Sequence, residues 1–129
     1  MSSVIIYKNK DLLKCGISLL SNLSDRMFDI ALNAGHLDSE PLIIFISSMQ
    51  TSWYYSLDRF STEGVKLFAK LAIQSINELI QEGYFDLSPE AIQDRLAKKI
   101  SLDIPRGDKT QALEFKQRLE EIIKELEAA

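Results

Sequence analysis

The chain has little of what enzymes and metal sites use. Its 129 residues include one cysteine, Cys15, and one histidine, His36, and its five glycines are scattered singly. A single cysteine cannot form an internal disulfide, and isolated glycines do not make a phosphate-binding loop. A lone histidine in a loop is usually solvated or caps a helix carbonyl. We therefore expect no enzyme activity, no cofactor and no metal site.

Asp25 and Asp29 are four residues apart, the spacing of two metal-binding carboxylates on one helical face. No histidine or glutamate is in register with them, and Lys14 and Ser18 share the same face. A solvated helix face explains the pair better than a metal site does.

Signals for secretion and for membrane insertion are also missing. The first residues, MSSVIIYKNKDLLK, have neither the apolar core nor the cleavage site of a signal peptide. The most apolar stretch, residues 41–60, is long enough to cross a bilayer, but serine, threonine and glutamine interrupt it and Asp58 and Arg59 close it. We expect a cytoplasmic protein with no membrane contact.

The composition is that of an ordinary globular domain. Hydrophobic residues make up 46% of the chain and charged residues 26%, with a formal net charge of −4. A chain of this length fits a single domain, here residues 1–129. Its mild acidity gives no global attraction to nucleic acid, which leaves local patches as the only basis for such binding.

Helical periodicity dominates the first half of the chain. Residues 4–7, VIIY, predict a short extended segment that docks on a helix or pairs with another chain. Residues 10–34 carry a very wide apolar arc, which predicts a central helix. In the 41–60 stretch Leu42, Ile46 and Met49 recur at helical spacing, which favours a core helix over a strand.

The second half predicts three further helices. Residues 62–82 show one continuous apolar face that ends at Gly83, and Ser88-Pro89-Glu90 is a typical helix start. Pro105 and Gly107 break the chain before a last helix at 108–129. The predicted fold is therefore all-α: a compact bundle of about five helices with a short extended N-terminal segment.

The last helix has a heptad-like seam, formed by Ala112, Phe115, Leu119, Ile122 and Leu126. About two and a half heptads are short for an autonomous coiled coil, so packing on its own domain is the default. The break at 105–107 leaves a second interpretation open, in which residues 108–129 form a C-terminal helical arm.

Two surplus apolar strips suggest contact with a protein partner or with a second copy. The first lies opposite the core stripe of the 41–60 helix and comprises Ile44, Ser48, Thr51 and Tyr55. The second consists of Leu67 and Leu71, on the polar side of the 62–82 helix. Both have a plain alternative: the first is sandwiched inside the bundle, and the second is covered by another part of the chain.

Charge gathers locally in the segment 95–109. Its basic residues form a potential phosphate-binding edge and are Arg95, Lys98, Lys99, Arg106 and Lys109. Cations are also favoured near helix C-termini, which explains the same residues without a ligand. No recognisable motif supports base readout.

Two function hypotheses follow. The first is a non-enzymatic small helical subunit or adaptor that acts through protein–protein contacts within a larger assembly. The alternative is a nucleic-acid-associated small subunit of a ribonucleoprotein, contacting backbone phosphates through the 95–109 edge without reading sequence. In size and architecture alone, that alternative resembles the small helical subunits of CRISPR effector complexes.

Overall fold

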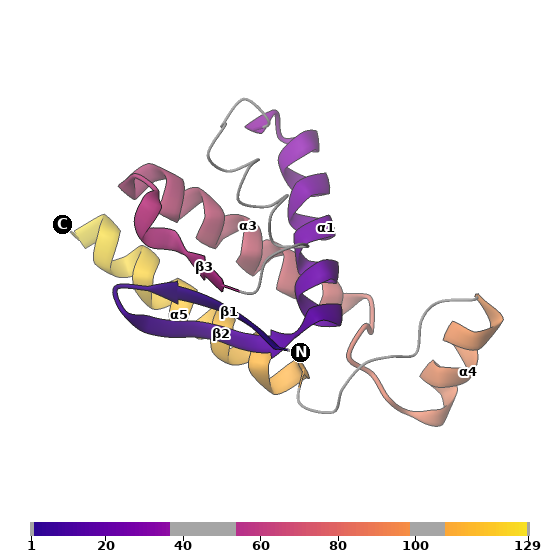
Figure 1. The fold of residues 1–129 in the computed structure, drawn as a ribbon. Helices are drawn as coiled ribbons and strands as arrows, with labels where there is room; N and C mark the ends of the chain where they lie inside the picture. The colour runs from indigo at the N-terminus through magenta and orange to yellow at the C-terminus, as the bar shows by residue number, and fades with distance from the viewer. Residues whose placement is uncertain (1, 37–53, 99–107, 129) are drawn as a thin grey trace.

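The computed structural model describes residues 2–36, 54–98 and 108–128. The described chain is mostly helical, with a small sheet at its N-terminus (Figure 1). Its elements, in chain order, are β1 (Ser2–Tyr7), β2 (Lys10–Gly16), α1 (Ile17–Asn33), β3 (Tyr54–Ser56), the 3-10 helix η2 (Leu57–Arg59), α3 (Thr62–Gln81), α4 (Pro89–Ala97) and α5 (Asp108–Ala128).

The sheet has the strand order β2-β1-β3, with β2 antiparallel and β3 parallel to β1. Lys8 and Asn9 connect β1 to β2 in a two-residue turn, and both have left-handed backbones, with φ of 49° and 63°. This is the turn geometry that matches the twist of a tight hairpin. The Lys8 amide donates to Asp58 Oδ1 at 3.1 Å, which ties the turn to η2.

The predicted helix at 10–34 is therefore wrong over its first part, because Lys10–Gly16 is a strand. The extended segment at 4–7 is confirmed, but it pairs with the chain's own β2. Backbone groups of VIIY need a ladder partner, and the adjacent residues supply one at the smallest loop-closure cost.

A bulge explains why β2 mimics helical periodicity. Ile5 pairs with Leu13 and Ile6 with Asp11, so Leu12 is an extra residue without a ladder partner. Leu12 and Leu13 are consequently both buried, although they are neighbours in a strand. Arg118 Nη1 donates to the Leu12 carbonyl at 2.9 Å and joins α5 to the bulge.

The predicted helix at 41–60 is also wrong at its C-terminal end, since Tyr54–Ser56 is a strand and Leu57–Arg59 a 3-10 turn. Tyr55 lies beside Ile5 in the parallel ladder and is buried. Pairing with β1 overrides the local helical pattern, because it satisfies backbone groups on that side of the central strand. The rest of the stretch, residues 41–53, lies outside the described residues.

Three predicted helices are confirmed as α3, α4 and α5. At the C-terminus of α3, the Gly83 amide donates to Ile80 (3.1 Å) and the Tyr84 amide to Leu79 (2.9 Å). This pair of bonds is a Schellman motif, which needs the positive φ of +77° that Gly83 adopts. A purely all-α bundle of five helices is nevertheless incorrect, because the described residues form four α-helices and a three-stranded sheet.

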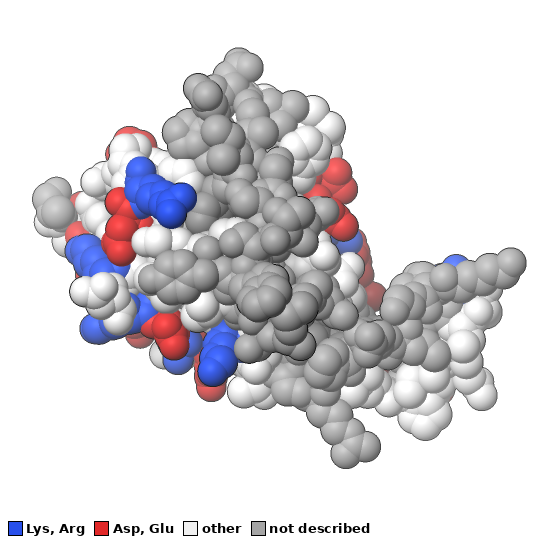
Figure 2. Space-filling view, viewed as in Figure 1, with Lys and Arg blue, Asp and Glu red and all other residues white. Residues whose placement is uncertain are grey.

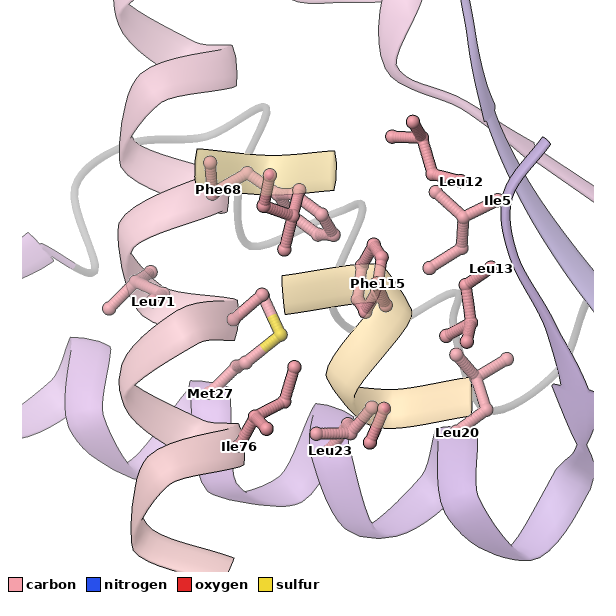
Figure 3. Close-up of a cluster of buried hydrophobic side chains, with 14 of the residues drawn as sticks. Ile5, Leu12, Leu13, Leu20, Leu23, Met27, Phe68, Leu71, Ile76 and Phe115 are labelled. Carbon is pink, nitrogen blue, oxygen red and sulfur yellow. The ribbon is translucent and has the colours of Figure 1, made fainter. Parts of the chain in front are cut away.

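The core lies between α1, α3, α5 and the hairpin. Figure 3 shows Phe115 of α5 at its centre, with Phe68 of α3, Leu20 of α1 and Leu13 of β2 around it. The seam residues Ala112, Phe115, Leu119 and Ile122 are all buried there. The last helix thus packs on its own chain, against α3 and β2. The assignment of residues 1–129 to one domain stays a prediction.

Candidate interaction surface

Helix α4 stands apart from the rest of the described chain (Figure 1). α1, α3 and α5 contribute many buried side chains to the core, whereas α4 contributes none of those that the structure describes. The segment after α3 carries α4 outward, beginning at the Schellman turn of Gly83. Tyr84 and Phe85 follow, and their rings meet edge to face with centroids 4.8 Å apart.

The orientation of α4 is the reverse of what an amphipathic helix in a bundle adopts. Ala91, Asp94 and Lys98, one polar face, line a groove against α1 and the end of α3. Ile92 and Leu96 lie on the opposite side at helical spacing. Leu96 is 58% exposed, and Leu87, just before the helix, is 40% exposed. Leu96 and Leu87 therefore point away from the described body of the protein, whereas Ile92 is half-buried.

The groove under α4 has a volume of about 480 Å³, and its lining mixes charged side chains with apolar ones such as Leu79 and Ala91. Arg26 of α1 bridges Glu78 of α3 and Glu82, the residue that follows α3: its guanidinium donates to Glu82 at 2.8 Å and to Glu78 at 3.3 Å. The pKa of Arg26 is raised above its ordinary value, chiefly by the hydrogen bond to Glu82. Asn22 donates to the Tyr84 hydroxyl at 2.9 Å. These bonds fix the platform from which α4 projects.

The predicted partner residues lie mostly elsewhere. Ile44, Ser48 and Thr51 are outside the described residues. Tyr55 and Leu71 are buried, and Leu67 is half-buried against the same core cluster. Tyr55 and Leu71 are thus covered by the chain itself, Leu67 keeps part of its surface open, and partner binding by these residues stays a prediction.

The predicted basic edge stays a prediction, because the structure describes the side chains of only Lys98 and Lys109 among its five residues. Lys98 is exposed, and its Nζ lies 3.0 Å from Asp94 Oδ2. It also lines the groove that contains Glu82 and Asp86. Lys109 is exposed in the first turn of α5. The side chain of Arg95 is not described, and Lys99 and Arg106 lie in the undescribed segment between α4 and α5.

The cysteine and the histidine of the chain lie in different parts of the described structure. Cys15 is buried on β2, and His36 is exposed just after α1. Within the residues that can be placed, no group of three or more histidine, cysteine, aspartate or glutamate side chains is close enough to hold a metal ion. None of the helices placed there is long and apolar enough to cross a bilayer.

Sequence reasoning recognised α4 and its stripe but missed its exposure. The apolar positions of a short helix look the same whether they face a core or solvent. The only sequence feature that bears on the orientation of α4 is the polar face opposite Leu96, where Asp94 and Lys98 form an i,i+4 pair. That signal does not distinguish a side facing solvent from a side facing a polar groove.

Comparisons with known proteins identify no relative. No family model, curated protein or solved structure matches the chain. Function must therefore be argued from the surfaces of this chain alone.

Proposed function

We propose that the protein is a non-enzymatic helical subunit or adaptor that works through protein–protein contacts in a larger assembly, with α4 as its contact helix. The observation that supports this most directly is the apolar stripe of Ile92 and Leu96, whose exposed member is Leu96. An apolar stripe gains free energy only when something covers it, at about 25 cal/mol per Å². Because Asp94 and Lys98 of α4 face its own body and no described element buries Leu96, we assign that cover to another molecule.

Local contacts stabilise α4 as a helix before any partner binds. Ser88 caps it by accepting the Ala91 amide (3.3 Å), and the Ser88 amide donates to Asp86 (2.9 Å). Pro89 occupies its first turn, and Lys98 pairs with Asp94 near its end. An isolated helix of nine residues is marginal in water, so these contacts reduce the ordering cost of binding.

The partner that fits α4 is a larger protein with an apolar groove that takes Leu87, Ile92 and Leu96 as anchors. A helix of nine residues is about 14 Å long at 1.5 Å per residue. Two such helices side by side would cover only one face of each, which falls short of the roughly 1,200 Å² of a stable interface. An apolar groove on a larger partner would cover the flanks of α4 in addition to its apolar face, and so would bury more of its surface.

The test compares two exposed leucines. Leu96→Glu puts a charge into the proposed contact, while Leu113→Glu does the same on α5, where the wild-type leucine is also exposed. Tagged proteins are purified from native cells with nuclease treatment, and any protein retained by the parent is identified and titrated in pure form. We expect Leu96→Glu to weaken that complex by at least about tenfold, which corresponds to about 1.4 kcal/mol.

Leu113→Glu should leave that affinity within about twofold of the parent, a change of less than about 0.5 kcal/mol. Equal affinity for the parent and Leu96→Glu would show that α4 is not the contact. Light scattering of the pure chain measures whether it forms a dimer, which tests whether a second copy is the partner. If the parent is a dimer and Leu96→Glu a monomer, the larger-partner assignment is wrong and α4 pairs with itself.

A further inference from the structure

Strand β2 forms one edge of the sheet. Among the described strands, β1 has a neighbour on each side, whereas β2 has one only on the side of β1 (Figure 1). An edge strand presents backbone N–H and C=O groups that can pair with a strand of another molecule. β2 has seven residues, while β3, at the other edge, has three. β2 is therefore the edge that offers an added strand the longer backbone.

The exposed side chains of β2 match those of a second copy. Asp11 and Lys14 are both exposed, and they lie on one face of the sheet, because their ladder partners on β1 are two residues apart. When two copies of β2 run antiparallel with Leu12 opposite Leu13 of the second copy, Asp11 lies opposite its Lys14. Two-fold symmetry repeats this pair. Opposite charges directly across two strands stabilise their pairing, so a second copy is a strand partner that suits this edge.

Arg118 of α5 lies at the middle of the edge. Its Nη1 donates to the Leu12 carbonyl at 2.9 Å, and Leu12 is the bulge residue that has no ladder partner on β1. Because the guanidinium lies at hydrogen-bond distance from the strand, it occupies space that the backbone of an added strand would need. Pairing at this edge therefore requires that the bond between Arg118 and Leu12 breaks first.

The packing of α5 on β2 does not fill the space beside the strand. A groove of about 170 Å³ lies between them, lined by Leu12 on the strand and by Ile122 on the helix. Arg118 lines the same groove and bridges it. Its Nη2 lies 4.0 Å from Glu114, a surface pair that contributes little. The bond to Leu12 is thus the contact that holds the guanidinium at the edge.

We propose that Arg118 closes the β2 edge against pairing with a second copy of this chain, in the register that sets Asp11 opposite Lys14. The bulge adds to the closure, since it bends the strand and interrupts the ladder. Arg118 is the part that can be displaced, because its side chain is half-exposed. The closure keeps the chain from associating through its sheet. The inference is independent of α4, because it rests on β2 and α5.

The test opens the edge by one substitution and measures the mass of the full chain in solution. Arg118→Met removes the donor, while the matched control Glu114→Gln removes the neighbouring carboxylate and leaves the bond to Leu12. Light scattering follows the mass from about 10 μM to about 500 μM, because a dimer forms by mass action. We expect Arg118→Met to dimerise with a Kd at least about tenfold below that of the parent, and Glu114→Gln to stay within about twofold of the parent.

Two further variants, made together with Arg118→Met, test the register. Lys14→Glu sets an acid opposite Asp11 of the second copy and should weaken the dimer at least about tenfold. Adding Asp11→Lys reverses both charges and restores the opposite pairs, so the Kd should return to within about threefold of that of Arg118→Met. Such a restoration distinguishes strand pairing from unspecific association, which a second charge change does not repair.

Three outcomes would overturn the inference: Arg118→Met keeps the parent's mass at every concentration, Arg118→Met and Glu114→Gln dimerise alike, or Lys14→Glu leaves the dimer unchanged. Urea unfolding of dilute protein shows whether each variant folds. If Arg118→Met does not fold, Arg118→Gln replaces it, because its shorter side chain ends before the Leu12 carbonyl, and the same outcomes decide. Leu96→Glu should not change this dimerisation, so failure here would not bear on the α4 contact, nor would failure there bear on the edge.

Discussion

At the scale of single residues, this chain is joined by a few contacts between distant segments. Arg118 and Leu12 are 106 positions apart, yet the guanidinium caps the carbonyl of the bulged residue. The amide of Lys8 reaches Asp58 in the same way. Both contacts satisfy backbone groups that a tight hairpin with a bulge leaves unpaired. A single substitution at Arg118 removes one such contact, and its cost can be measured as a change in the free energy of unfolding.

Arg118→Met is the first prediction. Methionine keeps much of the packing of the arginine stem but leaves the Leu12 carbonyl without a donor. We expect the free energy of unfolding in urea to fall by about 1 kcal/mol. This is less than the roughly 1.5–3 kcal/mol of a bond to a charged group, because the side chain is half-exposed and water competes.

The control for that variant is Glu114→Gln. Glu114 lies 4.0 Å from Arg118 at the surface, so losing its charge removes a weak ion pair and keeps the bond to Leu12. Its effect should stay below about 0.5 kcal/mol. If both variants lose the same amount, the bond to the bulge contributes nothing of its own.

At the scale of elements, α5 and α4 show two uses of the same amphipathic pattern. The seam of α5 is buried, with Phe115 and Leu119 fully enclosed between α3 and the hairpin. On α4, Leu96 is exposed and Ile92 is half-buried. Periodicity predicts both helices correctly, but only the position of the rest of the chain separates a core helix from a contact helix.

Leu119→Ala is the second prediction, because it tests α5 as part of the core. Removing a fully buried leucine should lower the free energy of unfolding by about 3 kcal/mol, the sum of lost transfer energy and a residual cavity. Leu113→Ala, an exposed leucine on the same helix, should cost less than about 1 kcal/mol. Urea titration followed by circular dichroism measures both. Similar small losses would mean that α5 behaves as a detached arm.

At the scale of the whole molecule, charge is distributed in a way that bears on the choice between the two function hypotheses. The net charge is −4, and on the face in Figure 2 positive and negative side chains alternate over the hairpin and α5. Lys98 is paired with Asp94 beside the groove that contains Glu82 and Asp86. Phosphate binding without base readout depends on lysine and arginine side chains that reach the backbone phosphates, and on the face in Figure 2 carboxylates lie among them.

The third prediction concerns nucleic acid. We expect the parent protein to retain neither DNA nor RNA at about 0.15 M salt, because neighbouring carboxylates offset the lysines that the structure places. An electrophoretic shift or anisotropy titration over a range of salt concentrations measures this. If the parent does bind and the double variant Lys98→Glu, Lys99→Glu both weakens binding and flattens its salt dependence, the ribonucleoprotein alternative becomes the better account.

The predicted site overlaps little with the surfaces that the structure leaves open. Leu71 occurs on the polar side of α3 in a helical wheel, but it is buried, because the neighbouring elements cover more of that helix than its main apolar face. Phe28 counts as a core residue by pattern and is instead partly exposed. A wheel assigns positions relative to its own axis and contains no information on how many neighbours surround the helix.

The sequence by itself determined the elements whose stability is local. α3, α4 and α5 begin and end where caps, proline and glycine place them, since hydrogen bonds within a few residues set those ends. Only the tertiary structure decided that residues 10–16 pair with β1, that Tyr54–Ser56 extends the sheet, and which face of each helix stays open. These features depend on partners far away in the chain, and the same apolar spacing satisfies a helix or a bulged strand until those partners are in place.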